Sequence, residues 1–293
     1  MADQPQPTRS PREVLAPVTE VRHVPGARLY TETRGTGPVL LCIVGGNGDA
    51  EVFGQIAAAL APRFTVVVYD RRGFVRSPLD GPVDDAARLA TDVDDAVRVI
   101  EHQGQEPAYV LGSSSGAIVG LALLARHPDR VRTLVAHEPP LVTLLPDAAA
   151  WLALFDDLHA TYLASGVAPA MAKFAAAVGL PALRDLPPGV QLPPGIAAML
   201  ARMPANQAFW LEHELRSYPR FVPDLDALRL AAGKLVLGVG RASLDIPLAR
   251  PTRLLADALG AAVVEFAGGH IGYVTESAAF AARLAEVLLV GPG

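Results

Sequence analysis

The sequence is poor in residues that cross-link proteins or bind acidic polymers. Cysteine occurs once in 293 residues, as Cys42 inside an apolar run. A single cysteine excludes an intrachain disulfide and a cysteine-based metal site, and it predicts a buried thiol. Lysine occurs only as Lys173 and Lys234, the other basic residues are scattered arginines, and the net charge is −5. Without a basic patch, the protein is not expected to bind nucleic acid.

Long hydrophobic runs are also missing. No apolar run approaches the roughly 20 residues that cross a bilayer. Residues 1–17 are polar and proline-rich, without the apolar stretch of a secretion signal. We therefore expect a cytoplasmic protein with a flexible tail over residues 1–17 and no membrane partner. No spacing of His, Asp and Glu indicates a metal site, and we expect no cofactor.

Short β-rich runs alternate with helical patterns along most of the chain. Hydrophobic residues make up 51% and charged residues 19% of the sequence, as in a folded globular protein. Residues 18–34 alternate apolar and polar around Pro25-Gly26, which predicts an antiparallel hairpin at a sheet edge. The later runs lack alternation, as strands buried on both faces do. The predicted strands are 18–24, 27–34, 38–44, 64–69, 107–112, 132–137, 234–239 and 262–266, and the predicted helices are 50–60, 85–102, 115–126, 249–259 and 277–289. This order predicts an α/β fold built on a mostly parallel eight-stranded sheet.

The strand signal stops between residues 141 and 223. This segment is rich in Ala and Leu, is interrupted by prolines, and contains both tryptophans, Trp151 and Trp210. We interpret residues 141–223 as a helical cap inserted into an α/β core made of residues 18–140 and 224–293. Such an insert is expected to cover the carboxyl ends of the strands and wall a pocket there.

The most informative motif is Gly112-Ser113-Ser114-Ser115-Gly116. It lies between a predicted strand and a predicted helix, and it has the form G-x-S-x-G. In a nucleophile elbow the glycines permit a sharp strand-to-helix turn that exposes one hydroxyl. Of the three serines, only Ser114 has a glycine two residues away on both sides, so the spacing selects Ser114.

Five segments in order resemble the α/β-hydrolase superfamily over nearly the whole chain. They are Val39–Gly48, Tyr69–Ser77, Gly112–Gly116, Arg126–Val131 and Gly268–His270. A lone G-x-S-x-G arises by chance in Gly/Ser-rich loops, whereas five matched segments in the correct order do not. The resemblance implies the α/β-hydrolase fold, with a helical cap, and a serine hydrolase mechanism.

A serine hydroxyl needs a base to remove its proton, and histidine suits that task near neutral pH. His270 follows the last predicted strand after two glycines, at the rim of the sheet where Ser114 also emerges. A carboxylate must orient the imidazole, and two compete for this role. Asp245 follows the seventh strand, where many α/β-hydrolases keep their acid. Glu138 ends the sixth strand, where haloalkane dehalogenases and certain lactone hydrolases keep theirs. We favour Glu138, because Pro139-Pro140 stiffens its backbone.

An oxyanion hole requires two backbone N–H groups. The resemblance implies that Ser115, the residue after the nucleophile, supplies one of them. The other is expected from Gly46, with Asn47 as the alternative, in the glycine-rich loop after the third strand. Relatives commonly carry His-Gly before this donor, whereas this chain has Val44-Gly45. The loop is not a phosphate loop, because it lacks the Gly-Lys-Ser/Thr ending.

The arginine-rich stretch Asp70–Ser77 invites an anion-binding interpretation, but we favour internal ion pairs that brace the loop beside the elbow. The cap is apolar and aromatic, which suits a neutral, hydrophobic substrate. Candidate substrate-binding residues are Trp210, Phe209, Trp151 and Met203. Taken alone, each of them more often belongs to the core of such a cap than to its substrate contacts.

The predicted function is hydrolysis of carboxylic esters or lactones of a small, largely apolar molecule, by a monomer or homodimer. A serine nucleophile argues against dehalogenase and epoxide hydrolase chemistry. Alternatives on the same triad are perhydrolysis, C–C bond hydrolysis and a cyclisation or lyase step. A non-catalytic small-molecule receptor on the same fold is a further alternative. A peptidase is disfavoured, because no acidic anchor for a substrate amine is evident.

Overall fold

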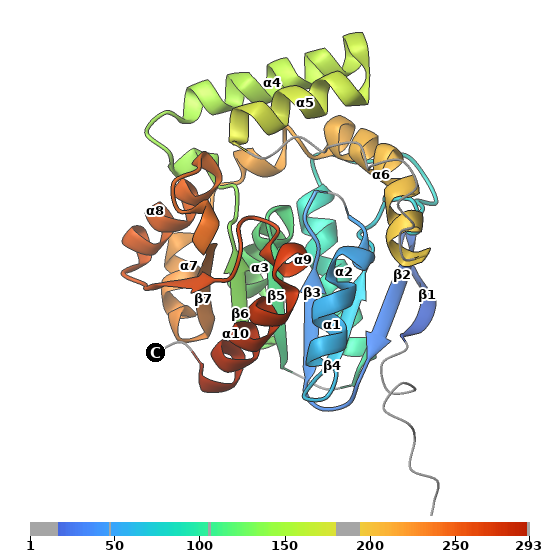
Figure 1. Ribbon diagram of the computed structural model, residues 1–293, viewed down its shortest axis with the longest axis vertical. Coiled ribbons are helices and arrows are strands. Elements are labelled where there is room, and N and C mark those ends of the chain that lie inside the picture. Colours follow the sequence, from blue (N-terminus) through green and yellow to red (C-terminus); the bar gives the residue numbers. More distant parts are fainter. Residues whose placement is uncertain (1–16, 47, 105–106, 180–193, 292–293) are drawn as a thin grey trace, which may run out of the picture.

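A twisted, mostly parallel sheet forms the centre of the protein (Figure 1). The computed structural model describes residues 17–46, 48–104, 107–179 and 194–291, and within them the chain forms an eight-stranded sheet. The strands are β1 (Val18–Val24), β2 (Ala27–Arg34), β3 (Val39–Ile43), β4 (Thr65–Tyr69), β5 (Ala108–Ser113), β6 (Val131–His137), β7 (Leu235–Gly240) and β8 (Val263–Phe266). Their order is β1-β2-β4-β3-β5-β6-β7-β8. Strands β3 to β8 pair in parallel, whereas β1 pairs antiparallel with β2, and β2 with β4. The predicted sheet and its edge hairpin are confirmed.

Helices cover both faces of the sheet and account for its continuous apolar strands. Along β3, Leu41 and Ile43 belong to one apolar cluster and Leu40 and Cys42 to another. The first cluster includes side chains of α2 (Arg88–His102), α3 (Ser115–Arg126), α7 (Leu225–Leu230) and α8 (Arg250–Leu259). The second includes side chains of α1 (Gly54–Leu60), α9 (Gly272–Thr275) and α10 (Ser277–Val290). Because both faces of β3 are buried, its sequence shows no polar alternation.

Three further helices lie between β6 and β7 in the chain. They are α4 (Ala148–Ser165), α5 (Val167–Val178) and α6 (Pro194–His213). Figure 1 shows α4 and α5 lying across the molecule above the carboxyl ends of the strands. These helices share a small apolar core that includes Phe155, Leu158, Ala170 and Leu211. Residues 180–193 of the expected cap and 1–16 of the expected tail lie outside the described residues, and the division into core and cap stays a prediction.

Candidate active site

Ser114 stands alone between the last residue of β5 and the first residue of α3. Its backbone has φ 55° and ψ −125°, in a region that side chains rarely adopt. The flanking glycines make this turn possible through close backbone approach rather than through their own φ angles. A Cβ built on Gly112 would lie 2.4 Å from the carbonyl oxygen of Gly116, and one built on Gly116 would lie 2.1 Å from that of Ile43. The local geometry is that of a nucleophile elbow.

The Glu138 carboxylate is fully buried and bonded to the predicted base. Its Oε2 lies 2.6 Å from Nδ1 of His270, and its Oε1 accepts a hydrogen bond of 2.7 Å from the Gly240 backbone N–H. Burial raises the pKa of Glu138, but the hydrogen bond and charge of His270 outweigh it and hold that pKa below its ordinary value. Because Glu138 occupies Nδ1, the other ring nitrogen, Nε2, is available for proton exchange with a hydroxyl.

Neighbouring parallel strands bring these groups to one edge of the sheet. Ser114 follows β5 and donates its backbone N–H to the His137 carbonyl oxygen at 2.9 Å. Glu138 follows β6 and donates its own N–H to Gly238 of β7 at 3.0 Å. Since β5, β6, β7 and β8 are consecutive in the sheet, their carboxyl ends lie side by side. The alternative acid, Asp245, is exposed on the loop after β7.

The glycine-rich loop after β3 lies against the elbow. A Cβ built on Gly45 would lie 3.6 Å from Oγ of Ser114, and one built on Gly46 would lie 2.6 Å from Nε1 of Trp210. The predicted donor Gly46 therefore follows a residue that borders Ser114 and lies against Trp210 of α6, whereas its alternative Asn47 lies outside the described residues. Ser115 opens α3, where an N–H has no acceptor within the helix and the helix dipole favours negative charge.

The other candidate substrate residues have different surroundings. Phe209 packs on Phe74 with ring centroids 5.0 Å apart. Trp151 bonds Asp147 through Nε1 at 3.3 Å, and Met203 is half-buried on α6. Of the four candidates, Trp210 is the one whose indole the structure places against the glycine-rich loop.

The arginines of the Asp70–Ser77 stretch are held in ion pairs. Arg71 pairs with Asp92 and Glu214, Arg72 pairs with Asp95, and Arg76 pairs with Asp70, Asp49 and Glu32. This arrangement agrees with the interpretation of the stretch as an internal brace. The sequence could not identify the partners, because most of them come from other elements and Glu214 lies 143 residues beyond Arg71.

Sequence patterns also do not single out His137, the last residue of β6. Its imidazole is fully buried, with Nδ1 3.5 Å from Oγ of Ser113. The rings of Phe266, Tyr273 and Phe280 surround it with centroids 5.8, 6.4 and 5.3 Å away. Burial lowers the pKa of His137 to about 4. The residue before Glu138 is therefore a neutral histidine at neutral pH.

In the described parts of the chain, no group of three or more His, Cys, Asp or Glu side chains is arranged to hold a metal ion. No described helix combines the length and apolarity that crossing a membrane requires.

Comparisons with known proteins agree with this fold. A family model described as the alpha/beta hydrolase fold matches residues 38–178. The uncharacterized hydrolase YraK of Bacillus subtilis (strain 168) is 34% identical over 271 residues, which cover 90% of this chain and 94% of YraK. A zearalenone hydrolase of Bionectria ochroleuca is 29% identical over 216 residues, covering 70% of this chain and 73% of that protein. The crystal structure of a hydrolase from Pseudomonas aeruginosa PA01 matches with a TM-score of 0.66 at 22% identity, over 92% of this chain and 98% of the other. With its elbow, its sheet and a relative matched over nearly its full length, the chain belongs to the alpha/beta hydrolase family.

Proposed function

We propose that this hydrolase cleaves carboxylic esters or lactones through an acyl-enzyme formed on Ser114. The observation that carries the proposal is the contact of 2.6 Å between Glu138 and Nδ1 of His270, on strand ends that adjoin the elbow of Ser114. A buried carboxylate in this place fixes the tautomer of the imidazole and stabilises its protonated form. The pair therefore provides an oriented base at the same edge of the sheet as a serine whose hydroxyl the elbow turns out of the chain.

In the proposed reaction, Oγ of Ser114 attacks the substrate carbonyl carbon while Nε2 of His270 takes the hydroxyl proton. The protonated His270 then gives this proton to the leaving alcohol oxygen as the C–O bond breaks. Water repeats the sequence on the acyl-enzyme and releases the acid. Glu138 stays ionised throughout. General acid–base assistance of this kind contributes roughly 10²–10⁴ to the rate.

The tetrahedral intermediate places negative charge on the former carbonyl oxygen. We assign its two hydrogen-bond donors to the backbone N–H groups of Ser115 and Gly46. The first lies at the start of α3, and the second belongs to the loop that borders Ser114. Each donor of an oxyanion hole contributes roughly 10²–10³ to kcat.

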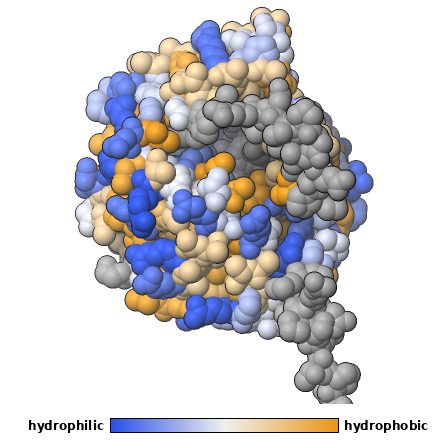
Figure 2. All heavy atoms as spheres, viewed as in Figure 1, coloured by the Kyte–Doolittle hydropathy of each residue, from blue (hydrophilic) through white to orange (hydrophobic). Residues whose placement is uncertain are grey.

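The surroundings of the site favour an apolar acyl or alkyl group. The Trp210 indole lies against Gly46, and Phe174 packs on Trp210 with centroids 5.1 Å apart. Figure 2 shows apolar side chains gathered between the upper helices and the core on the face it presents. We propose α4, α5 and α6 as the cap over the substrate and Trp210 as the cap residue that contacts it. The relative named for the hydrolysis of zearalenone, a lactone, adds support for lactones as substrates.

The test is labelling by a fluorophosphonate probe combined with a turnover screen over esters, lactones and thioesters. We expect the folded protein to be labelled and active, and Ser114→Ala to lose both properties. Ser113→Ala is the matched control, because it removes the adjacent, fully buried hydroxyl and leaves the nucleophile in place. A folded wild-type protein that neither labels nor turns over any of these substrates would contradict the proposal and favour the receptor alternative.

A further inference from the structure

Arg71 is a fully buried cation directly beneath the glycine-rich loop. Its Nε donates to the carbonyl oxygen of Val44 at 3.0 Å, and its Nη2 donates to that of Gly45 at 3.0 Å. One guanidinium group thus holds two consecutive carbonyls of the loop that borders Ser114. The reaction steps proposed above make no use of this residue.

Because a peptide unit is planar, the contact of Arg71 with the Gly45 carbonyl also fixes the direction of the oxyanion donor, the Gly46 N–H. The Gly45 carbonyl and the Gly46 N–H belong to the same planar peptide unit, and in a trans peptide they point in opposite directions. The backbone N–H of Gly48 also donates to the Gly45 carbonyl, at 3.0 Å. With the oxygen end held by two donors, the N–H end is directed away from Arg71. A rotation of this plane would move the Gly46 donor out of line.

Arg71 is itself fixed by a residue beside the cap. Its Nη1 and Nη2 donate to the two carboxylate oxygens of Glu214 at 2.8 and 2.7 Å, and Nη1 also donates to Asp92 at 2.8 Å. Glu214 is fully buried and immediately follows α6. Burial lowers the pKa of Arg71, but the charges of Glu214 and Asp92 outweigh it and hold that pKa well above its usual range. The guanidinium therefore stays charged and cannot turn without breaking charged hydrogen bonds.

We propose that Arg71 is a positioning residue for the oxyanion hole, and that Glu214 couples the end of α6 to that hole through Arg71. The inference rests on the proposed function, since an oxyanion hole matters only for acyl transfer at Ser114. Arg71 acts by orienting the Gly45–Gly46 peptide and does not touch the substrate. The orientation of the Gly46 N–H thereby depends on the position of the end of α6.

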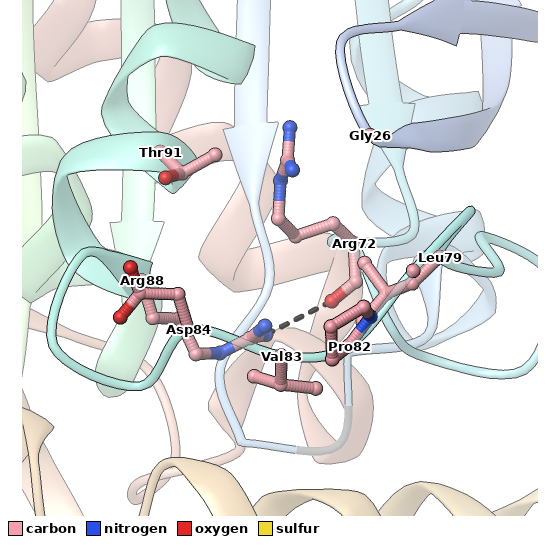
Figure 3. A pocket seen from close by; sticks show the side chains of 9 residues that line it. Gly26, Arg72, Leu79, Pro82, Val83, Asp84, Arg88 and Thr91 are labelled. Atoms are coloured by element: carbon pink, nitrogen blue, oxygen red, sulfur yellow. Dashed lines mark hydrogen bonds between the residues drawn. The ribbon is translucent and has the colours of Figure 1, made fainter.

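Arg72 provides a matched control for the adjacent position. It makes a comparable buried ion pair, with Nε and Nη2 each 2.7 Å from Asp95. Its backbone contact, however, is with the Pro25 carbonyl in the β1–β2 turn. Figure 3 shows the Arg72 side chain extending away from Arg88, while the Arg72 carbonyl accepts a hydrogen bond of 2.9 Å from Arg88. Arg72 thus shares the burial and charge of Arg71 without touching the glycine-rich loop.

The experiment compares Arg71→Lys with Arg72→Lys on a short-chain aryl ester. Lysine keeps the positive charge but cannot reach two carbonyls and two carboxylates together. We expect Arg71→Lys to lower kcat roughly 10–100-fold with KM nearly unchanged, because a misaligned donor weakens only the transition state. The inhibition constant of an aryl trifluoromethyl ketone, whose adduct carries the oxyanion, should rise by a similar factor. Arg72→Lys should leave kcat and this inhibition constant within about threefold of wild type.

Glu214→Gln keeps the shape of the carboxylate and removes its charge, so it is expected to lower kcat less than Arg71→Lys and in the same pattern. This variant also carries the test if Arg71→Lys fails to fold. The inference is overturned if Arg71→Lys, or Glu214→Gln in its place, loses no more kcat than Arg72→Lys, or if the loss lies in KM alone. Fluorophosphonate labelling separates this failure from that of the proposed function, because an unlabelled, inactive wild type refutes both.

Discussion

His137 should make the stability of the protein depend on pH near neutrality. Its imidazole is fully buried against aromatic rings, and burial lowers its pKa from 6.5 to about 4. Between these values the unfolded chain binds a proton at this residue and the folded protein does not. Since stability rises with pH wherever the unfolded state binds more protons, acidification through this interval must destabilise the fold.

The magnitude follows from the difference between the two pKa values. A pH of 5 lies 1.5 units below the pKa of 6.5 of the unfolded imidazole, so the unfolded chain is protonated there. The same pH lies above the pKa of about 4 of the folded imidazole, which stays neutral. At about 1.4 kcal/mol per pKa unit, His137 alone removes about 2 kcal/mol of unfolding free energy between pH 7.5 and pH 5. The loss begins near pH 6.5 and levels off near pH 4.

The assay is urea denaturation of wild type and His137→Gln from pH 7.5 to pH 5. Glutamine does not titrate, and it can still bond the neighbouring Ser113 hydroxyl. We expect the free energy difference between the two proteins to shift by about 2 kcal/mol across this range in favour of the variant at low pH. His23→Gln, which removes an exposed histidine of β1, controls for the loss of one imidazole. A difference that stays constant with pH would show that His137 has the same pKa in the folded and unfolded protein and refute the reasoning.

Two further predictions concern the acid and the elbow. Glu138→Gln should lower kcat on an aryl ester by roughly 10³–10⁴, because the imidazole loses its charged partner, whereas Asp245→Asn should stay near wild type; the reverse result in steady-state kinetics would move the acid to Asp245. Gly116→Ala should lower the free energy of unfolding by about 1–3 kcal/mol, because its Cβ would lie 2.1 Å from the Ile43 carbonyl oxygen. Gly233→Ala, with nothing within 4 Å of the new Cβ, is the control in thermal melts, and equal losses would contradict the packing argument.

The sheet was predictable because each buried strand is a short apolar run between turn signals. The sequence predicts strands at 38–44, 64–69 and 107–112, and the structure has β3 at Val39–Ile43, β4 at Thr65–Tyr69 and β5 at Ala108–Ser113. The differences of one residue arise at the ends, where pairing with the neighbouring strand decides the boundary. The sequence of the strand alone does not specify where that pairing ends.

The sequence alone could not decide whether Glu138 or Asp245 is the carboxylate that orients His270. Each residue ends or follows a strand on the same rim, and each precedes His270 in the chain. What distinguishes them is a contact between Glu138 and His270 across 132 residues of sequence. The sequence contained one relevant signal, the two prolines after Glu138, which indicated a stiff backbone at that position. The exposure of Asp245 depends on the path of a loop that no local pattern specifies.

Backbone strain points to Ser114 and Glu138 by an independent route. Among the described residues, the non-glycine residues with positive φ are Ser114 at 55° and Glu138 at 49°. Such conformations cost roughly 1–3 kcal/mol each and persist where surrounding contacts hold them, which is typical of functional sites. Here the contacts run across three strands, from the Ser114 N–H to the carbonyl of His137 and from the Glu138 N–H to that of Gly238. A rigid frame of backbone hydrogen bonds therefore fixes the serine and the carboxylate relative to each other. The motif around Ser114 predicts a sharp turn there, whereas the strain at Glu138 could not be predicted from its own turn, because the bond that holds it links it to β7.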